Sequence, residues 1–224
     1  MIEVVSATRM SEDEFWQKSA LGLSLLRLGR DPRLATRLSY ENRRGLPDVY
    51  NTSISARNEN EYLVFIHDDV WIDDYYFVDR IIEGLRHFEV LGVAGNRRRM
   101  PRQTSWAFVG ADFSWDDDAN LTGSIATGPS PFGAICLFGP VPAECELLDG
   151  VFLAARRSVL QAHNVMFDPR FQFHMYDVDF CRTARQQGLR LATWPICMTH
   201  QSEGAFGTPQ WHEMMQTYLD KWGD

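Results

Sequence analysis

The 224-residue sequence has no apolar run that approaches the roughly 20 residues a transmembrane helix requires. Its first residues also lack the basic segment and long apolar stretch of a secretory signal peptide. Cysteine is scarce, and no two cysteines form the C-x-x-C pair that is typical of a zinc site. The four cysteines are Cys136, Cys145, Cys181 and Cys197. We therefore expect a cytoplasmic protein with reduced thiols and no transmembrane segment, although peripheral contact with a membrane stays open.

Basic residues are outnumbered, since 22 Lys and Arg stand against 30 Asp and Glu, for a net charge of −8. This balance argues against a nucleic-acid partner, because Lys and Arg side chains supply most non-specific affinity for phosphates. Hydrophobic residues at 45% and charged residues at 23% are typical of a globular protein and exclude a disordered chain or a coiled coil. The length suits one large α/β domain and leaves the oligomeric state open.

The first half of the chain alternates short apolar runs with longer amphipathic ones, which predicts a mostly parallel central sheet with helices on both faces. Tyr62–Ile66 is apolar and rich in β-forming residues, as expected of a central strand covered on both sides. The other expected strands are 2–7, 34–40, 90–94, 147–154 and 191–198, the last interrupted by Pro195. The expected helices are 15–28, 47–58, 73–88, 157–162, 177–187 and one that begins at Pro209.

Residues 95–146 lack a clear period and are rich in Gly, Pro, Ser and Trp. They predict a long loop or irregular hairpin region, and such segments in compact domains often bind ligands. Trp106 and Trp115 lie in this region. Because the apolar faces of sugar rings pack on aromatic side chains, both are candidates for an acceptor platform, with simple burial of the loop as the alternative. Arg97–Arg98–Arg99 is interpreted as part of a solvated loop.

The first group of candidate functional residues is His67-Asp68-Asp69, which directly follows the central strand. Ligands of open parallel sheets bind at the carboxyl ends of the strands, so these side chains are well placed for a ligand. Two acids and an imidazole suit a divalent cation such as Mg²⁺ or Mn²⁺. The alternative is a solvated strand end at which one Asp caps the next helix.

Three further groups lie at predicted element ends. Asp177 is at the start of a helix, as either an N-cap or a general base. His200 follows the last strand, where a metal ligand and an ordinary surface histidine are both plausible. Asn42-Arg43-Arg44-Gly45 follows the second strand and could contact phosphate, or be a basic surface loop.

The order of these elements along nearly the whole chain resembles the family 2 glycosyltransferases of the GT-A fold. In that family an acidic triplet, the DxD motif, closes the central strand and binds a metal and the nucleotide-sugar diphosphate. His67 stands where the first acid is usual, which resembles a subgroup termed glycosyltransferase-like. The resemblance implies that Asp69 is a metal ligand, with His67 and Asp68 near the ribose or sugar.

The resemblance also assigns the remaining motifs. Asp149-Gly150 matches the segment that lines the donor sugar and the acceptor, and His200 matches a late histidine that reaches the metal or diphosphate. Asp177 matches the second acid of a Glu-Asp pair, the catalytic base, and Tyr176 replaces the Glu. The segment expected to contact the nucleotide after the first strand is Ala7-Thr8-Arg9, together with Asn42, Arg44 and Gly45. Ala7-Thr8-Arg9 replaces the Pro-Thr-Tyr-Asn that is usual after the first strand. The Asp-x-x-Ser that is usual after the second strand is missing.

The resemblance therefore implies a single GT-A (Rossmann-like) α/β domain over residues 1–224 with a small antiparallel or irregular segment. Residues 1–95 would form the nucleotide-binding half, 96–208 the acceptor and catalytic half, and 209–224 a C-terminal helix. The implied activity is inverting, Mn²⁺- or Mg²⁺-dependent transfer of a sugar from a nucleoside-diphosphate donor, expected to be a UDP-sugar. The acceptor would be a glycan, a lipid-linked saccharide or another hydroxyl, in a setting of polysaccharide biosynthesis.

Two other classes of function fit the residues. A non-catalytic nucleotide-sugar or glycan-binding module of the same fold would explain Tyr176 and the altered first loop. A metal-dependent phosphoesterase or nucleotidyltransferase also places carboxylates at strand ends.

Overall fold

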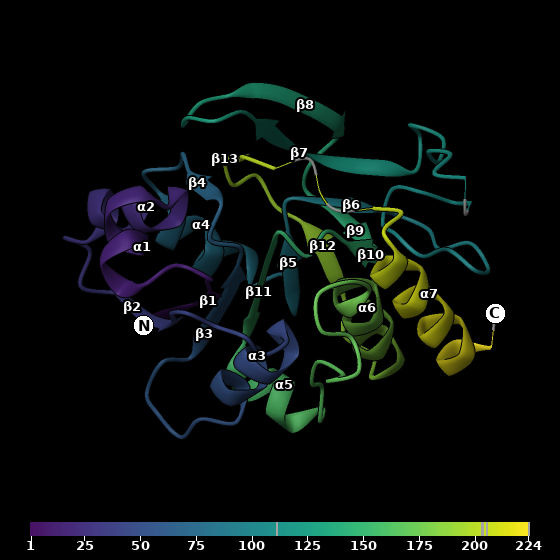
Figure 1. Ribbon diagram of the computed structural model, residues 1–224, viewed down its shortest axis with the longest axis horizontal. Coiled ribbons are helices and arrows are strands. Elements are labelled where there is room, and N and C mark those ends of the chain that lie inside the picture. Colours follow the sequence, from purple (N-terminus) through teal and green to yellow (C-terminus); the bar gives the residue numbers. More distant parts are fainter. Residues whose placement is uncertain (111, 203, 205, 224) are drawn as a thin grey trace.

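Two β-sheets form the centre of the structure, a computed structural model that describes residues 1–110, 112–202, 204 and 206–223 (Figure 1). In the larger sheet five strands run in one direction, and only β11 and β9 run against them. The order across this sheet is β2 (Leu34–Ser39), β1 (Ile2–Ala7), β3 (Tyr62–Ile66), β11 (Phe152–Arg156), β5 (Val90–Gly92), β12 (Leu191–Thr193) and β9 (Ala143–Cys145). The predicted mostly parallel central sheet is therefore confirmed.

The second sheet is mostly antiparallel and contains residues that were expected to be irregular. Its order is β10 (Leu147–Leu148), β6 (Ala94–Asn96), β7 (Leu121–Thr127), β13 (Met198–His200) and β4 (Val70–Ile72), with β8 (Ala134–Gly139) paired to β7. The loop prediction for 95–146 was thus incomplete, because β7, β8 and β9 lie within it. Their partners include β6, β13 and β12, and a local pattern contains no information about such distant pairing.

The chain passes from the larger sheet to the smaller one four times, the first time from β3 to β4 over residues 67–69. The other three passages are from β5 to β6 at Val93, from β9 to β10 at Glu146, and from β12 to β13 over residues 194–197. The expected continuous strands 90–94 and 191–198 are therefore each split in two, and Pro195 lies in the second break. These crossings place the end of the smaller sheet beside the carboxyl ends of the parallel strands.

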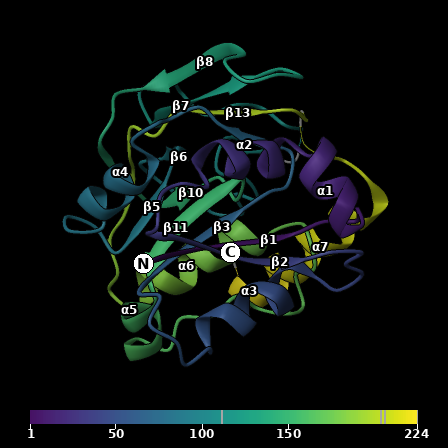
Figure 2. The same ribbon diagram turned by 90° about the vertical axis from the view of Figure 1, so that its left-hand side faces the viewer.

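Helices cover both faces of the larger sheet, as Figures 1 and 2 show. On one face lie α1 (Glu12–Lys18), α2 (Ala20–Leu28) and α4 (Phe77–Gly84), and on the other α3 (Leu46–Ile54), α5 (Arg157–Ala162) and α6 (Tyr176–Gln186). Strand alternation creates two separate cores. In β3, Val64 packs in the core that includes Phe15 and Phe77, whereas Phe65 packs in the one that includes Tyr50.

The helix predicted over 15–28 is two helices. The capping box is present, since the Ser11 side chain accepts from Glu14 N and Glu14 bonds back to Ser11 N. Ser19 is extended and its hydroxyl accepts from Gly22 N at 2.9 Å, so it begins a second helix. No helix in the described part of the chain is long and apolar enough to cross a membrane.

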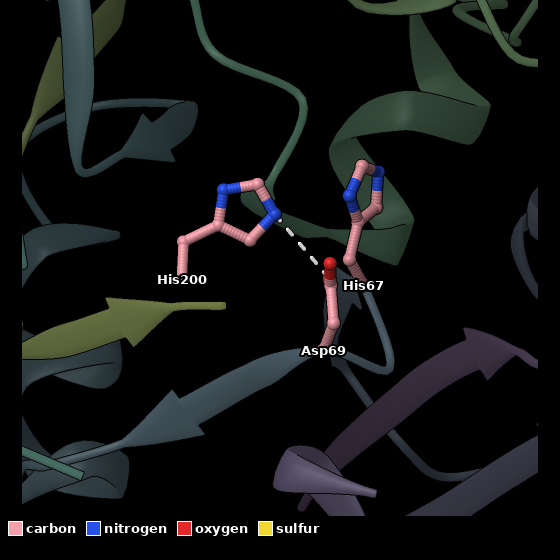
Figure 3. Close-up of side chains that lie close together, drawn as sticks. All are labelled: His67, Asp69 and His200. Carbon is pink, nitrogen blue, oxygen red and sulfur yellow. Dashed lines mark ion pairs between the residues drawn. The ribbon is translucent and has the colours of Figure 1, made fainter. Parts of the chain in front are cut away.

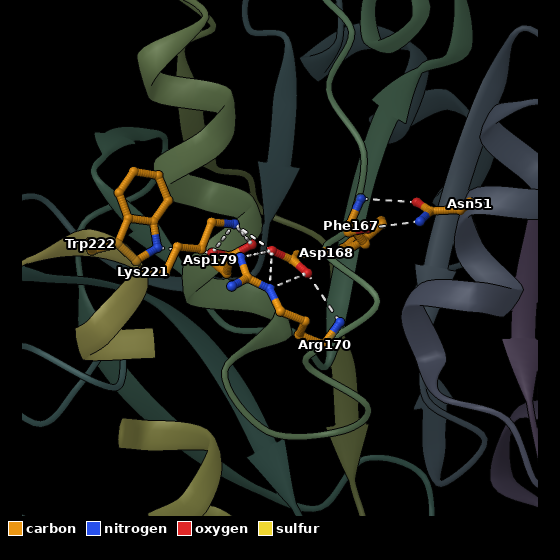
Figure 4. Close-up of polar contacts among 7 residues, drawn as sticks. All are labelled: Asn51, Phe167, Asp168, Arg170, Asp179, Lys221 and Trp222. Carbon is orange, nitrogen blue, oxygen red and sulfur yellow. Dashed lines mark hydrogen bonds and ion pairs between the residues drawn. The ribbon is translucent and has the colours of Figure 1, made fainter. Parts of the chain in front are cut away.

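The C-terminal helix α7 (Pro209–Trp222) lies beside α6 and is held there by a charged network (Figure 4). Position 224 of the predicted helix lies outside the described residues. The fully buried Asp179 of α6 accepts from Lys221 Nζ and from Trp222 Nε1, each at 2.9 Å. Lys221 Nζ also donates to Asp168 at 2.9 Å. This network ties α7 to α6 and to the loop that leads toward Asp177.

Replacing Lys221 should destabilise the protein, because Lys221→Met leaves the Asp179 carboxylate buried without its cation. We expect the free energy of unfolding to fall by about 3 kcal/mol, measured by urea denaturation. Lys18→Met is the matched control: Lys18 pairs with Glu14 on the surface, with both side chains about half exposed or more, and should cost less than about 1 kcal/mol. Equal losses in the two variants would contradict this role of Lys221.

Candidate functional site

Segments from both sheets meet at the carboxyl ends of the parallel strands. His67 follows β3, and Asp69 immediately precedes β4. Antiparallel pairing of β13 with β4 places His200 opposite Val70, so that His200 lies next to Asp69. Gln201 N donates to the Asp69 carbonyl oxygen at 3.0 Å and continues this contact. The histidine and the acid therefore meet because two segments far apart in the sequence pair as strands.

His67, Asp69 and His200 form a compact cluster of potential metal ligands (Figure 3). One ligand atom from each lies within 4.8 Å of the other two, and His200 Nε2 is 3.3 Å from Asp69 Oδ1. Asp69 Oδ1 is buried and pairs with the His200 imidazole. A buried carboxylate oxygen in that state fits a cation ligand. Two imidazoles with one carboxylate suit Mn²⁺ better than Mg²⁺, which prefers oxygen ligands.

The groups of the cluster shift one another's pKa values. Burial alone would raise the pKa of Asp69, but the hydrogen bond and charge of His200, with the charge of His67, outweigh it and lower that pKa to about 2. Burial lowers the pKa of His67. Burial alone would also lower the pKa of His200, but the hydrogen bond and charge of Asp69 outweigh burial and raise this pKa. Asp69 is thus an anion at neutral pH, as a metal ligand must be.

Tyr176, the first residue of α6, links this cluster to Gly150. Its hydroxyl is 2.8 Å from His67 Nε2 and 2.7 Å from the Gly150 carbonyl oxygen. A Cβ atom at position 150 would approach the Tyr176 hydroxyl and would lie only 2.7 Å from Asp177 Cβ, so the contact requires glycine. The sequence pattern marked Tyr176 only as a departure from Glu, and its contact with His67 could not be seen before folding.

Asp177 is the second residue of α6 rather than its N-cap, because Met175, at a positive φ of 65°, occupies the cap position. The Asp177 carboxylate accepts from Gly150 N at 3.1 Å. Burial, followed by the charge of Asp149, raises the pKa of Asp177 to about 6, against opposing backbone hydrogen bonds. A carboxylate with that pKa is suited to accept a proton near neutral pH.

A cleft of about 400 Å³ contains many of these side chains. Five of the residues predicted to bind the donor or metal or to act as base line it: His67, Asp149, Gly150, Asp177 and His200. A second part of the lining, here called the aromatic wall, consists of Trp106, Phe108, Trp115, Phe138, Phe206 and Trp211. The cleft therefore combines a polar, metal-binding side with an apolar side.

The two tryptophans predicted as an acceptor platform differ in exposure. Trp106 is only 8% exposed and packs edge-on against Phe138, with ring centroids 4.9 Å apart. Trp115 is 54% exposed and stacks on Phe138 at 5.9 Å. Trp115 can thus meet a ligand, whereas Trp106 is mostly covered by its contacts with Trp115 and Phe138. Phe173, which the sequence pattern did not single out, stacks on His67 at 5.9 Å.

The residues expected to contact the nucleotide lie next to the cleft rather than in its lining. Thr8 is buried and hydrogen-bonds the Asp68 carboxylate, whose pKa is raised by burial. Asn42 N donates to Thr8 O at 2.8 Å, which joins the two loops. Arg9 is exposed and Ala7 ends β1.

The loop 42–45 is closed by its own contacts. The Asn42 side chain donates to Arg44 O at 2.8 Å, and the Arg44 side chain is exposed. Gly45 caps α3, and a Cβ there would lie 3.0 Å from Gln172 Cα. Elsewhere, Arg98 pairs with the buried Asp116, so that part of the basic triplet has a structural role rather than being merely solvated.

Comparison with known proteins agrees with this architecture. The family model described as "Glycosyltransferase like family" matches residues 39–211. The chain belongs to this family. Curated proteins gave no match to the chain.

Solved structures of glycosyltransferases share the fold. The catalytic domain of Drosophila β1,4-galactosyltransferase 7, in complex with xylobiose, is 13% identical with a TM-score of 0.51, over 96% of this chain and 79% of that one. A mutant of the same enzyme, in complex with manganese, UDP-Gal and xylobiose, is 11% identical with a TM-score of 0.52, over 96% of this chain and 80% of that one. GalNAc-T7 with UDP, GalNAc and Mn²⁺ is 12% identical with a TM-score of 0.56, and this chain spans 50% of its length. The expected GT-A fold is confirmed.

Proposed function

We propose that the protein is a Mn²⁺-dependent glycosyltransferase that moves a sugar, with inversion, from a UDP-sugar to a hydroxyl of a glycan or lipid-linked saccharide. The observation that carries this proposal is the shared cleft. His67 and His200 of the metal-ligand cluster and the carboxylate of Asp177 all line it. Membership of the glycosyltransferase-like family supports the reaction class.

The donor would bind at the cluster side of the cleft. His67, Asp69 and His200 would hold the cation, which when bound supplies positive charge that stabilises a departing diphosphate. Two solved relatives of the same fold contain manganese or Mn²⁺ together with UDP or UDP-Gal, which supports this choice of metal and nucleotide. Residues 7–9 and 42–45, which adjoin Asp68, are proposed to contact the nucleotide.

The acceptor hydroxyl would approach Asp177. An ionised carboxylate within hydrogen-bonding reach can accept the hydroxyl proton as the oxygen attacks the anomeric carbon. The hydrogen bond from Gly150 N holds one carboxylate oxygen in place. Burial in the cleft raises the pKa of Asp177 toward neutrality, which supports it as the base.

Removing this base should abolish transfer and leave binding nearly intact. Asp177→Asn keeps the shape of the side chain but cannot accept the proton, so we expect UDP release from the cognate UDP-sugar to fall at least about 100-fold. Affinity for UDP with Mn²⁺, measured by calorimetry, should stay within about twofold, because Asp177 does not belong to the ligand cluster. The exposed Asp13→Asn is the control and should retain full activity.

The pH profile provides the second part of this test. The deprotonated carboxylate is the active form, so kcat/KM should rise with pH, reach half its plateau near pH 6, and be about tenfold lower at pH 5. Wild-type turnover in Asp177→Asn would exclude Asp177 as the base. Release of inorganic phosphate would indicate a phosphoesterase instead, and UDP-sugar binding without any release would indicate a binding module.

The aromatic wall is proposed to contact the acceptor. Trp115→Ala removes its most exposed indole, so the signal from glycans that bind the wild-type protein on an immobilised panel should fall about tenfold. Phe132→Ala is the control, because Phe132 is 63% exposed and does not line the cleft. Unchanged binding in Trp115→Ala would limit the wall to a packing role.

A further inference from the structure

The Tyr176 hydroxyl contacts His67 and the Gly150 backbone, and these two contacts together determine which nitrogen of His67 carries a proton. The Tyr176 ring is almost fully buried, with 3% exposure. Its oxygen is 2.8 Å from His67 Nε2 and 2.7 Å from the Gly150 carbonyl oxygen. Both distances are those of good hydrogen bonds; the contact with Gly150 is buried and the contact with His67 is partly buried.

Counting protons assigns a direction to each bond. A tyrosine hydroxyl has one proton to donate, and a carbonyl oxygen can only accept. Tyr176 therefore donates to Gly150 O and must accept its second hydrogen bond from His67. Because the partner atom is Nε2, that nitrogen carries the imidazole proton.

The neutral ring of His67 then has a free lone pair on Nδ1. In Figure 3 one ring nitrogen of His67 faces Asp69 and His200, and the other points away from them. The nitrogen that points away is Nε2, which is bound to Tyr176, so the nitrogen that faces the cluster is Nδ1. A metal ligand needs an unprotonated nitrogen in that direction.

Asp69 alone would favour the opposite arrangement. A carboxylate attracts a proton onto the nitrogen that faces it, and an Nδ1–H group cannot bind a cation. We propose that Tyr176 is a positioning residue that keeps the His67 proton on Nε2 and so leaves Nδ1 open for the metal. This inference rests on the proposed metal site. It also explains why position 150 needs glycine, since a side chain there would displace the Tyr176 hydroxyl.

The tautomer of His67 can be read directly in metal-free protein from two-bond ¹H–¹⁵N correlations of the imidazole. We expect the Nε2–H form in the wild type and a shift toward the Nδ1–H form in Tyr176→Phe, which retains the ring but lacks the hydroxyl. In calorimetric titrations with MnCl₂ alone, Tyr176→Phe should bind about tenfold more weakly than wild type. Tyr218→Phe is the matched control: it removes another buried hydroxyl, which lies on α7 and accepts from Arg182 of α6, and should change neither readout.

The outcomes separate this inference from the proposed function. An Nδ1–H tautomer in the wild type would overturn it, and so would wild-type tautomer and affinity in Tyr176→Phe. The wild-type measurement keeps the inference falsifiable even if Tyr176→Phe fails to fold. Failure of the wild-type protein to bind MnCl₂ would contradict the metal site, while the tautomer measured without metal would still decide the role of Tyr176.

Discussion

The antiparallel pairing of β13 with β4 is the interaction on which the site depends. It places His200 beside Asp69 and closes the smaller sheet over the ends of the parallel strands. This pairing is possible because the chain leaves the larger sheet after β12 and crosses to the smaller one. Without that crossing, the second imidazole would be absent from the cluster.

The two sides of the cleft are built differently, and this matches the chemistry proposed for them. The polar side is well defined, since His67, Tyr176, Gly150 and Asp177 are connected by successive hydrogen bonds that are buried or partly buried. The apolar side consists of rings that contact one another edge-on or stacked. A well-defined polar side suits a reaction that needs defined geometry, and an aromatic side suits the apolar faces of sugars.

The sequence predicted the elements whose pattern is local, and missed those that depend on distant partners. The buried strand Tyr62–Ile66 and the capping box at Ser11 were both found, because alternation and capping chemistry are readable over a few residues. The strands within 95–146 were not, because their pairing with β6 and β13 decides them. Similarly, His67, Asp149, Gly150, Asp177 and His200 do meet in one cleft, whereas the role of Tyr176 depends on a contact across 109 positions.

The central claim is that one divalent cation is held by His67, Asp69 and His200 at the cleft that contains Asp177. Anomalous diffraction at the manganese edge, from crystals grown with Mn²⁺ and UDP, tests it most directly. The account predicts one strong peak within bonding distance of all three side chains, with the UDP phosphates on its open side. Ordered UDP with no manganese at these three residues, or manganese bound elsewhere, would contradict it.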